Sequence, residues 1–101
     1  AVASADWQAA QAAVQRLIWR DIRLLLNEAK AGGEGVRPTL TAVFHDYNLL
    51  SGLVQQRDFV ADQRIKRAIR TAVLRASDSA VVLQACNEID SELGKALSRQ
   101  P

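Results

Sequence analysis

Several residue types are scarce in this 101-residue chain, and each shortage excludes a class of structure. The chain has one cysteine, Cys86, which excludes an intramolecular disulfide and a cysteine-based metal site. It has one histidine, His45, so no second histidine is present to complete a zinc site. No apolar run approaches the roughly 18 residues of a membrane-spanning helix, so we expect no transmembrane segment.

The remaining composition is typical of one packed helical domain. Hydrophobic residues make up 49% of the chain and charged residues 24%, which argues against a disordered protein. Alanine and leucine are frequent, and these residues favour helices over strands. The net charge of +2 permits an acidic partner surface but does not by itself indicate nucleic-acid binding.

Helix start and stop signals predict four helices. The first begins at the N-cap type residue Asp6 and ends near Lys30, before the glycine-rich stretch 32–35. The second opens at Pro38, the third at Asp58, and the fourth after the polar break 77–79. The second and third helices join either by a tight kinked turn or as one long bent helix. Short loops between amphipathic helices favour an all-α, up-down four-helix bundle over residues 6–97, with tails at 1–5 and 98–101.

Apolar residues recur along each segment at the helical period, which predicts the core. The residues expected to face inward are Trp7, Ala10, Val14, Leu17, Ile18, Ile22, Leu25, Ala29, Leu40, Val43, Phe44, Tyr47, Leu50, Val54, Phe59, Ile65, Ala68, Ile69, Ala72, Val73, Ala76, Val82, Cys86, Ile89, Leu93, Ala96 and Leu97.

No set of residues has the spacing of a catalytic, cofactor or metal site. His45 and Asp46 are adjacent, so on a helix they point about 100° apart and form no dyad. Cys86 lies on an apolar stripe, where a small buried side chain is expected rather than a reactive thiol. Asp21 falls near the apolar stripe of the first helix, and we expect it to pair with an arginine of another helix. The prediction is therefore a non-enzyme without cofactors.

Basic residues are the strongest feature outside the core. Within about twenty residues the third helix region carries Arg57, Arg64, Lys66, Arg67, Arg70 and Arg75. These side chains form either a solvated face or a surface that docks on an acidic protein. No aromatic residues are interleaved with them, which argues against single-stranded nucleic acid. Trp19 has two interpretations: it packs in the core, which we favour, or it is an exposed interface anchor.

Three stretches of the chain resemble the PsbQ-like family, the extrinsic four-helix bundles on the lumenal face of photosystem II. They are the segment 19–23 late in the first helix, the segment 38–50 with its Pro-x-Leu start, and the segment 86–93 in the last helix. The resemblance covers roughly residues 15–97. The chain departs from the family in lacking a long extended N-terminal region, and in having aliphatic residues where aromatic ones are usual in the third helix.

The resemblance implies a non-catalytic protein of the chloroplast thylakoid lumen. It would bind the photosystem II core beside other extrinsic subunits and support the oxygen-evolving centre without binding the metal cluster. The alanine-rich start, residues 1–5, would then resemble the end left after thylakoid import. The residues expected to dock on the partner are Arg16, Trp19, Arg20, Arg23, Arg57, Arg64, Lys66, Arg67 and Arg70.

Other functions stay open at this point. A small helical adaptor or secretion-type chaperone would hold a partner helix in an apolar groove, for which the second helix offers Leu49, Leu50, Leu53 and Val54. An accessory subunit of another large membrane complex, respiratory or ATP synthase, would use the same basic docking face. A nucleic-acid binder and an enzyme are the least favoured classes.

Overall fold

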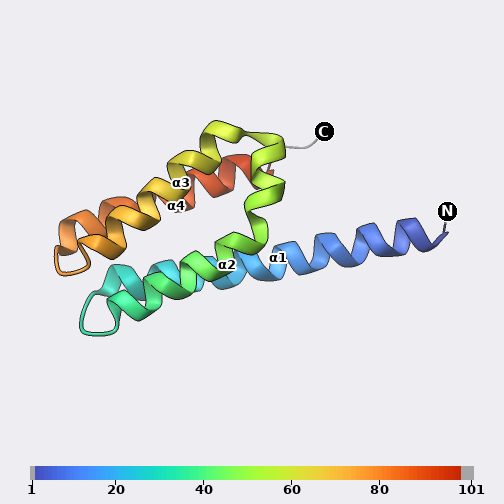
Figure 1. Cartoon of the computed structure of the whole chain (residues 1–101). Coiled ribbons are helices and arrows are strands. Elements are labelled where there is room, and N and C mark those ends of the chain that lie inside the picture. The colour runs from blue at the N-terminus through green and yellow to red at the C-terminus, as the bar shows by residue number, and fades with distance from the viewer. Residues whose placement is uncertain (1, 99–101) are drawn as a thin grey trace.

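The computed structural model describes the backbone of residues 2–98 and the side chains of residues 9–97, and over this range it is all-α. The four helices are α1 (Val2–Ala31), α2 (Val36–Arg57), α3 (Phe59–Leu74) and α4 (Ser79–Ser98), and the described residues contain no strand. Figure 1 shows two hairpins, α1–α2 and α3–α4, whose loops lie at the same end of the molecule. The predicted all-α class is confirmed.

The first helix differs from the prediction at its start and agrees at its end. It begins at Val2, so residues 2–5 belong to a helix and not to the expected tail. Alanine-rich sequence has high helix propensity, so the helix does not begin at Asp6 but extends beyond it toward the N-terminus of the chain. After Ala31, Gly32 and Gly33 have positive φ angles of 78° and 98°, a conformation that ends helices and that glycine adopts without strain.

Short aspartate side chains separate the later helices. Asp58 has an extended backbone (φ −159°, ψ 93°), and its side chain accepts a hydrogen bond from the Ala61 amide at 3.0 Å. This N-cap makes α2 and α3 two helices joined at one residue, which excludes the single long helix. Asp78 likewise accepts from the Val81 amide at 3.3 Å and caps α4. The C-terminal part of α2, which contains Ser51 and Gly52, bends toward α3 in Figure 1. Helix bends are common at Gly/Ser pairs.

Each helix packs on its neighbours in the chain. α1 contacts α2 and α4, and α3 contacts α2 and α4, whereas α1 and α3 do not approach each other within the described residues. The molecule is elongated, with extents of 51, 24 and 16 Å. α1 is the longest helix, and Figure 1 shows its N-terminal half (dark blue) extending past the other three.

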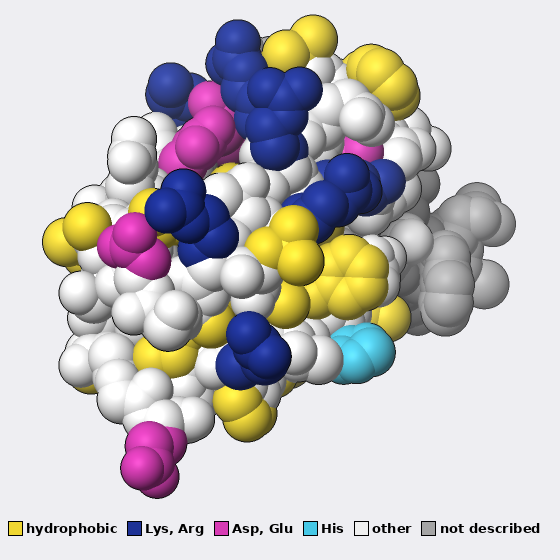
Figure 2. Space-filling view, turned by 60° about the vertical axis from the view of Figure 1, so that its left-hand side comes forward, with side chains coloured by type: hydrophobic (Ala, Val, Ile, Leu, Met, Phe, Trp, Pro, Cys, Tyr) yellow, Lys and Arg dark blue, Asp and Glu magenta, His cyan; other side chains and the backbone are white. Residues whose placement is uncertain are grey.

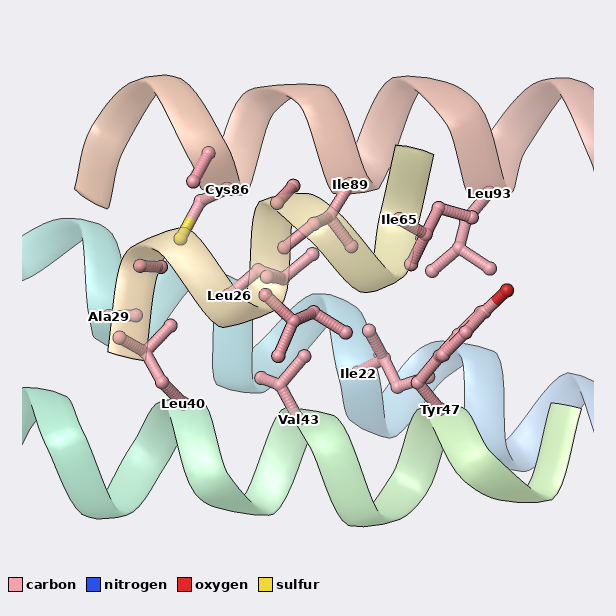
Figure 3. Close-up of a cluster of buried hydrophobic side chains, with 14 of the residues drawn as sticks. Ile22, Leu26, Ala29, Leu40, Val43, Tyr47, Ile65, Cys86, Ile89 and Leu93 are labelled. Atoms are coloured by element: carbon pink, nitrogen blue, oxygen red, sulfur yellow. The ribbon is translucent and has the colours of Figure 1, made fainter. Parts of the chain in front are cut away.

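The core lies between the four helices, and most predicted core residues occupy it. Figure 3 shows side chains from all four helices meeting in one cluster. The predicted residues that are buried are Ile22, Ala29, Leu40, Val43, Tyr47, Leu50, Val54, Ile65, Ala68, Ile69, Ala72, Val82, Cys86, Ile89, Leu93 and Ala96. Ile18, Leu25, Val73, Ala76 and Leu97 are partly buried against this cluster. Leu26, which the sequence analysis omitted, is buried.

Some predicted core residues are exposed, and those near the start of α1 lack a neighbouring helix. Val14 is 52% exposed, and Ala10 is also exposed, because they belong to the part of α1 that extends past the bundle. Leu17 is 64% exposed because it lies on the outward face of α1, with Arg20 and Leu24. Phe59 is 61% exposed in the first turn of α3, and Phe44 is 41% exposed beside α3. The predicted core position of Trp7 lies outside the described side chains.

Candidate docking surfaces

Four of the predicted docking residues lie together on α1. Arg16, Trp19, Arg20 and Arg23 follow the i, i+3, i+4, i+7 spacing that places side chains on one face of a helix. Two hollows adjoin this face. One, of about 510 Å³, is bounded by Ala12, Gln15, Arg16, Trp19, Leu53, Arg57 and Leu97. The other, of about 480 Å³, is bounded by Arg16, Trp19, Arg20, Arg23, Leu24 and Asn27. We call the surface formed by Arg16, Trp19, Arg20, Arg23 and Arg57 the Trp19 surface.

Trp19 itself combines the two positions that the sequence left open. Its side chain is partly buried against the core, and it also borders both hollows. The guanidinium carbon of Arg23 lies 5.9 Å from the indole ring centre, within the range of a cation–π contact. Its Nε1–H is buried and has no hydrogen-bond partner among the described residues. A buried donor without an acceptor is unfavourable by about 1–3 kcal/mol.

The arginines of the Trp19 surface differ in how firmly they are held. Arg57 donates from Nη1 to the carbonyl oxygens of Ala96 and Leu97, at 3.3 and 3.2 Å, at the C-terminal end of α4. Such a contact satisfies carbonyls that the helix itself leaves without a partner. Arg23 forms an exposed ion pair with Asp90 at 3.7 Å. Arg16 and Arg20 are exposed and have no ion pair with any described residue. Their charge is therefore available to a partner.

The bases of α3 lie on the side of the helix that faces away from the core, and they divide between its two edges. Arg64 pairs with Glu92 of α4 at 3.4 Å, and Arg67 borders a furrow between α3 and α4. Lys66 and Arg70 border a groove at the other edge of this face, between α3 and α2. At 100° per residue, the bases at 64, 66, 67 and 70 fall within an arc of about 160° on the side of α3 opposite its buried residues, so they share its outward face and reach both of its edges. Because α1 and α3 do not touch, these bases do not join the Trp19 surface.

A buried carboxylate joins α2 to α3, and the sequence analysis did not find it. Asp62 is fully buried and accepts hydrogen bonds from Tyr47 at 2.5 Å, Ser51 at 2.9 Å and Gln55 at 3.1 Å. Lys66 forms an ion pair with it at 3.1 Å. Burial by itself raises the pKa of Asp62, but these donors outweigh it and hold the pKa below its ordinary value. The signal in the sequence was the polar i, i+4 series at 47, 51 and 55 within an apolar helix face.

The pKa of Tyr47 moves in the opposite direction. Burial of the phenol raises it, and the neighbouring Asp62 carboxylate raises it further. The hydroxyl therefore remains a donor to Asp62, and the contact holds the two helices in register. The side chains of Tyr47, Ser51 and Gln55 on α2 all donate to Asp62, so we assign the cluster a structural role.

A second pair of carboxylates lies between α1 and α2. Asp21 was expected to pair with an arginine, but it forms no ion pair within the described residues and instead lies beside Asp46 of α2. Oδ2 of Asp46 is buried without a hydrogen-bond partner in the described structure. Burial and the neighbouring Asp21 carboxylate raise the pKa of Asp46 to about 6, while the charge of His45 acts in the opposite direction. The expectation failed because α3, which carries several of the arginines, does not contact α1 in the part of the chain that the structure describes.

The other candidate residues occupy the positions expected of structural side chains. His45 is exposed, and its ring centre lies 6.1 Å from that of Phe44. Cys86 is buried, and burial raises the pKa of its thiol. Among the described residues, no three His, Cys, Asp or Glu side chains are placed to hold a metal ion. None of the described helices is both long and apolar enough to cross a membrane.

The apolar groove that the sequence placed on α2 is not formed by the expected residues. Leu50 and Val54 are fully buried in the core and are not available to a partner, while Leu49 is 69% exposed and Leu53 borders the Trp19 surface. A different groove, of about 500 Å³, lies between α2 and α3. We call it the Phe44 groove, and its lining residues are Thr41, Phe44, Asn48, Lys66, Ile69, Arg70, Val73 and Leu74.

No family model, no curated protein and no solved structure matches this chain. The PsbQ-like resemblance therefore stays a prediction. What the chain does must be inferred from the chemistry of its two surfaces, the Trp19 surface and the Phe44 groove.

Proposed function

We propose that this protein is a non-catalytic docking subunit, which attaches through the Trp19 surface to an acidic surface of a large membrane complex. The partner that the sequence resemblance implies is the lumenal face of photosystem II, beside other extrinsic subunits, where the protein would support the oxygen-evolving centre. The location would be the thylakoid lumen, and the protein would be peripheral to the membrane.

The single observation that carries this proposal is the placement of arginines around Trp19. Tryptophan and arginine are the residue types most enriched at interface hot spots, where an aromatic anchor is surrounded by groups that a partner desolvates. Arg16 and Arg20 are exposed cations without an ion pair among the described residues. Trp19 adds a large apolar ring that borders both hollows. Carboxylates of a partner complement the two arginines, and an apolar side chain complements the ring.

The order of helix contacts supports an up-down four-helix bundle as the scaffold of this surface. Consecutive helices pack on each other, and α4 closes the arrangement against α1. In such a bundle the outer face of α1 is held rigid by α2 and α4 behind it. A rigid helix face suits docking, because its backbone loses little conformational freedom when it binds.

Retention on solubilised thylakoid membranes at low and high salt tests the proposal. We expect retention on photosystem II at low salt and its loss at high salt, because screening weakens attraction between exposed charges. The double variant Arg16→Glu/Arg20→Glu should abolish retention. The matched control Arg37→Glu/Arg67→Glu changes the net charge equally, at exposed sites outside the Trp19 surface, and should be retained.

Four other outcomes of the retention experiment would each contradict a stated part of the proposal. Equal loss of retention in both double variants would mean that net charge, and not the Trp19 surface, governs binding. Loss only in the control would place docking on another face. Absence of the wild-type protein from photosystem II at both salts would exclude that partner. Retention on respiratory or ATP synthase membranes instead would assign the protein to another large membrane complex.

A further inference from the structure

The Phe44 groove is an open apolar surface on the α2–α3 side of the molecule. Ile69 forms part of its buried floor, while Phe44 and Leu74 are 41% and 73% exposed at its sides. Figure 2 shows hydrophobic side chains gathered beside the single histidine, His45, with basic side chains next to them. A monomeric surface rarely leaves large apolar side chains clustered in a hollow, and such clusters commonly mark binding sites.

The groove is charged on one edge only. Lys66 and Arg70 lie on its α3 edge, Thr41 and Asn48 lie on its α2 edge, and no carboxylate is among its lining residues. Lys66 is held by the buried carboxylate of Asp62. Arg70 is exposed and forms no ion pair with a described residue, so its charge is available to a ligand. The occupant that complements this groove is therefore apolar on one side and acidic beside it.

The shape of the groove favours a helix over a lipid chain. Residues 41–48 of α2 span about 10 Å at ~1.5 Å per residue, which matches about two turns of a helix laid alongside. The exposure of Phe44 and Leu74 leaves the groove open along its length. An acyl chain lying in it would keep one side in water, whereas an amphipathic helix would cover the apolar residues and present its polar face to solvent.

We propose that the Phe44 groove binds an amphipathic helix of a partner protein, with apolar residues packed on Phe44 and acidic residues facing Arg70. This site is independent of the Trp19 surface. The two share no lining residue, and α3, which forms one edge of the groove, does not contact α1. A docking subunit with both surfaces would hold two partners at once.

A pair of synthetic helical peptides of about four turns tests the proposal. Both carry leucines at i, i+3, i+4 and i+7 and a fluorescent label; one has glutamates flanking the leucines and its twin has lysines. By fluorescence anisotropy we expect the glutamate peptide to bind at least ~10-fold more tightly than the lysine peptide. Arg70→Glu should weaken the glutamate peptide by about tenfold and strengthen the lysine peptide. Phe44→Ser should weaken both.

Matched control variants separate the groove from the rest of the surface. Leu49→Ser removes an exposed leucine of α2 that does not line the groove, and Arg20→Glu reverses an exposed charge on α1, which does not contact α3 among the described residues. Neither should change peptide affinity. Circular dichroism and thermal unfolding of every variant establish that it is folded, so a loss of binding is not a loss of structure.

Three results would overturn the inference. Failure of both peptides to bind the folded wild-type protein excludes a helix-binding groove. Equal affinity of the two peptides, unchanged by Arg70→Glu, excludes the acidic partner. Chemical-shift changes on peptide binding that map to Trp19 and not to Thr41, Phe44 and Asn48 place the helix elsewhere. None of these results depends on retention on photosystem II, so the two proposals fail separately.

Discussion

Replacing Asp46 with asparagine should stabilise the protein at neutral pH. Asp46 lies beside Asp21 with a buried oxygen that has no hydrogen-bond partner in the described structure. Its pKa is raised from the ordinary 3.8 to about 6. The native state therefore binds this proton more tightly than the unfolded chain does. Stability from the protonated carboxyl is present at low pH and is lost as the pH rises from about 4 through 6.

The size of the effect follows from the proton affinity. A tenfold change in proton affinity is worth about 1.4 kcal/mol, so a native pKa of about 6 corresponds to a cost of up to about 3 kcal/mol above that pH. Asp46 is partly exposed, and solvent screening reduces this upper limit. Asparagine has the shape of the protonated acid and donates a hydrogen bond toward the Asp21 carboxylate. We expect Asp46→Asn to gain about 1–2 kcal/mol near pH 7.5.

Urea unfolding at a series of pH values between about 4 and 8, followed by far-ultraviolet circular dichroism, measures this gain. The difference between Asp46→Asn and wild type should be largest near pH 7.5 and should approach zero near pH 4. Glu34→Gln, in the exposed α1–α2 loop, is the control for losing one negative charge. A variant less stable than wild type near pH 7.5, or a gain that does not vary with pH, would refute the reasoning about the carboxylate pair.

Two further changes test the structure. Asp62→Ala leaves the Tyr47 and Ser51 hydroxyls and the Lys66 ammonium without their acceptor. We expect the free energy of unfolding, measured in urea, to fall by about 3–5 kcal/mol. A loss under about 1 kcal/mol would show that water replaces the carboxylate readily. Gly32→Ala places a side chain at a φ of 78°, and should lower the free energy of unfolding by about 1–2 kcal/mol. Gly52→Ala, within a helix and with open space around it, should leave the free energy of unfolding unchanged or raise it. Equal effects of the two substitutions would refute the role of the positive φ.

The helices and most of the core could be predicted from local sequence because local interactions determine them. The period of apolar residues placed Leu40, Val43 and Ile89 inward, and Asp58 and the glycines after Ala31 marked helix ends where the structure has them. These signals act within one or two turns of the chain, through backbone hydrogen bonds and φ preferences. They do not depend on how the helices are arranged.

The surfaces depended on the tertiary structure, because an apolar or basic stripe does not specify which neighbour covers it. Val14 and Phe44 have the same periodic signal as buried residues, yet one extends past the bundle and the other borders a groove. Arg57, which the sequence groups with the arginines of α3, instead joins those of α1. Asp21 meets Asp46 because packing places α1 on α2 in one register. Contacts of this kind join residues that are far apart in the sequence. The sequence alone determined which face of each helix is apolar or polar, and the tertiary structure decided which faces lie against each other.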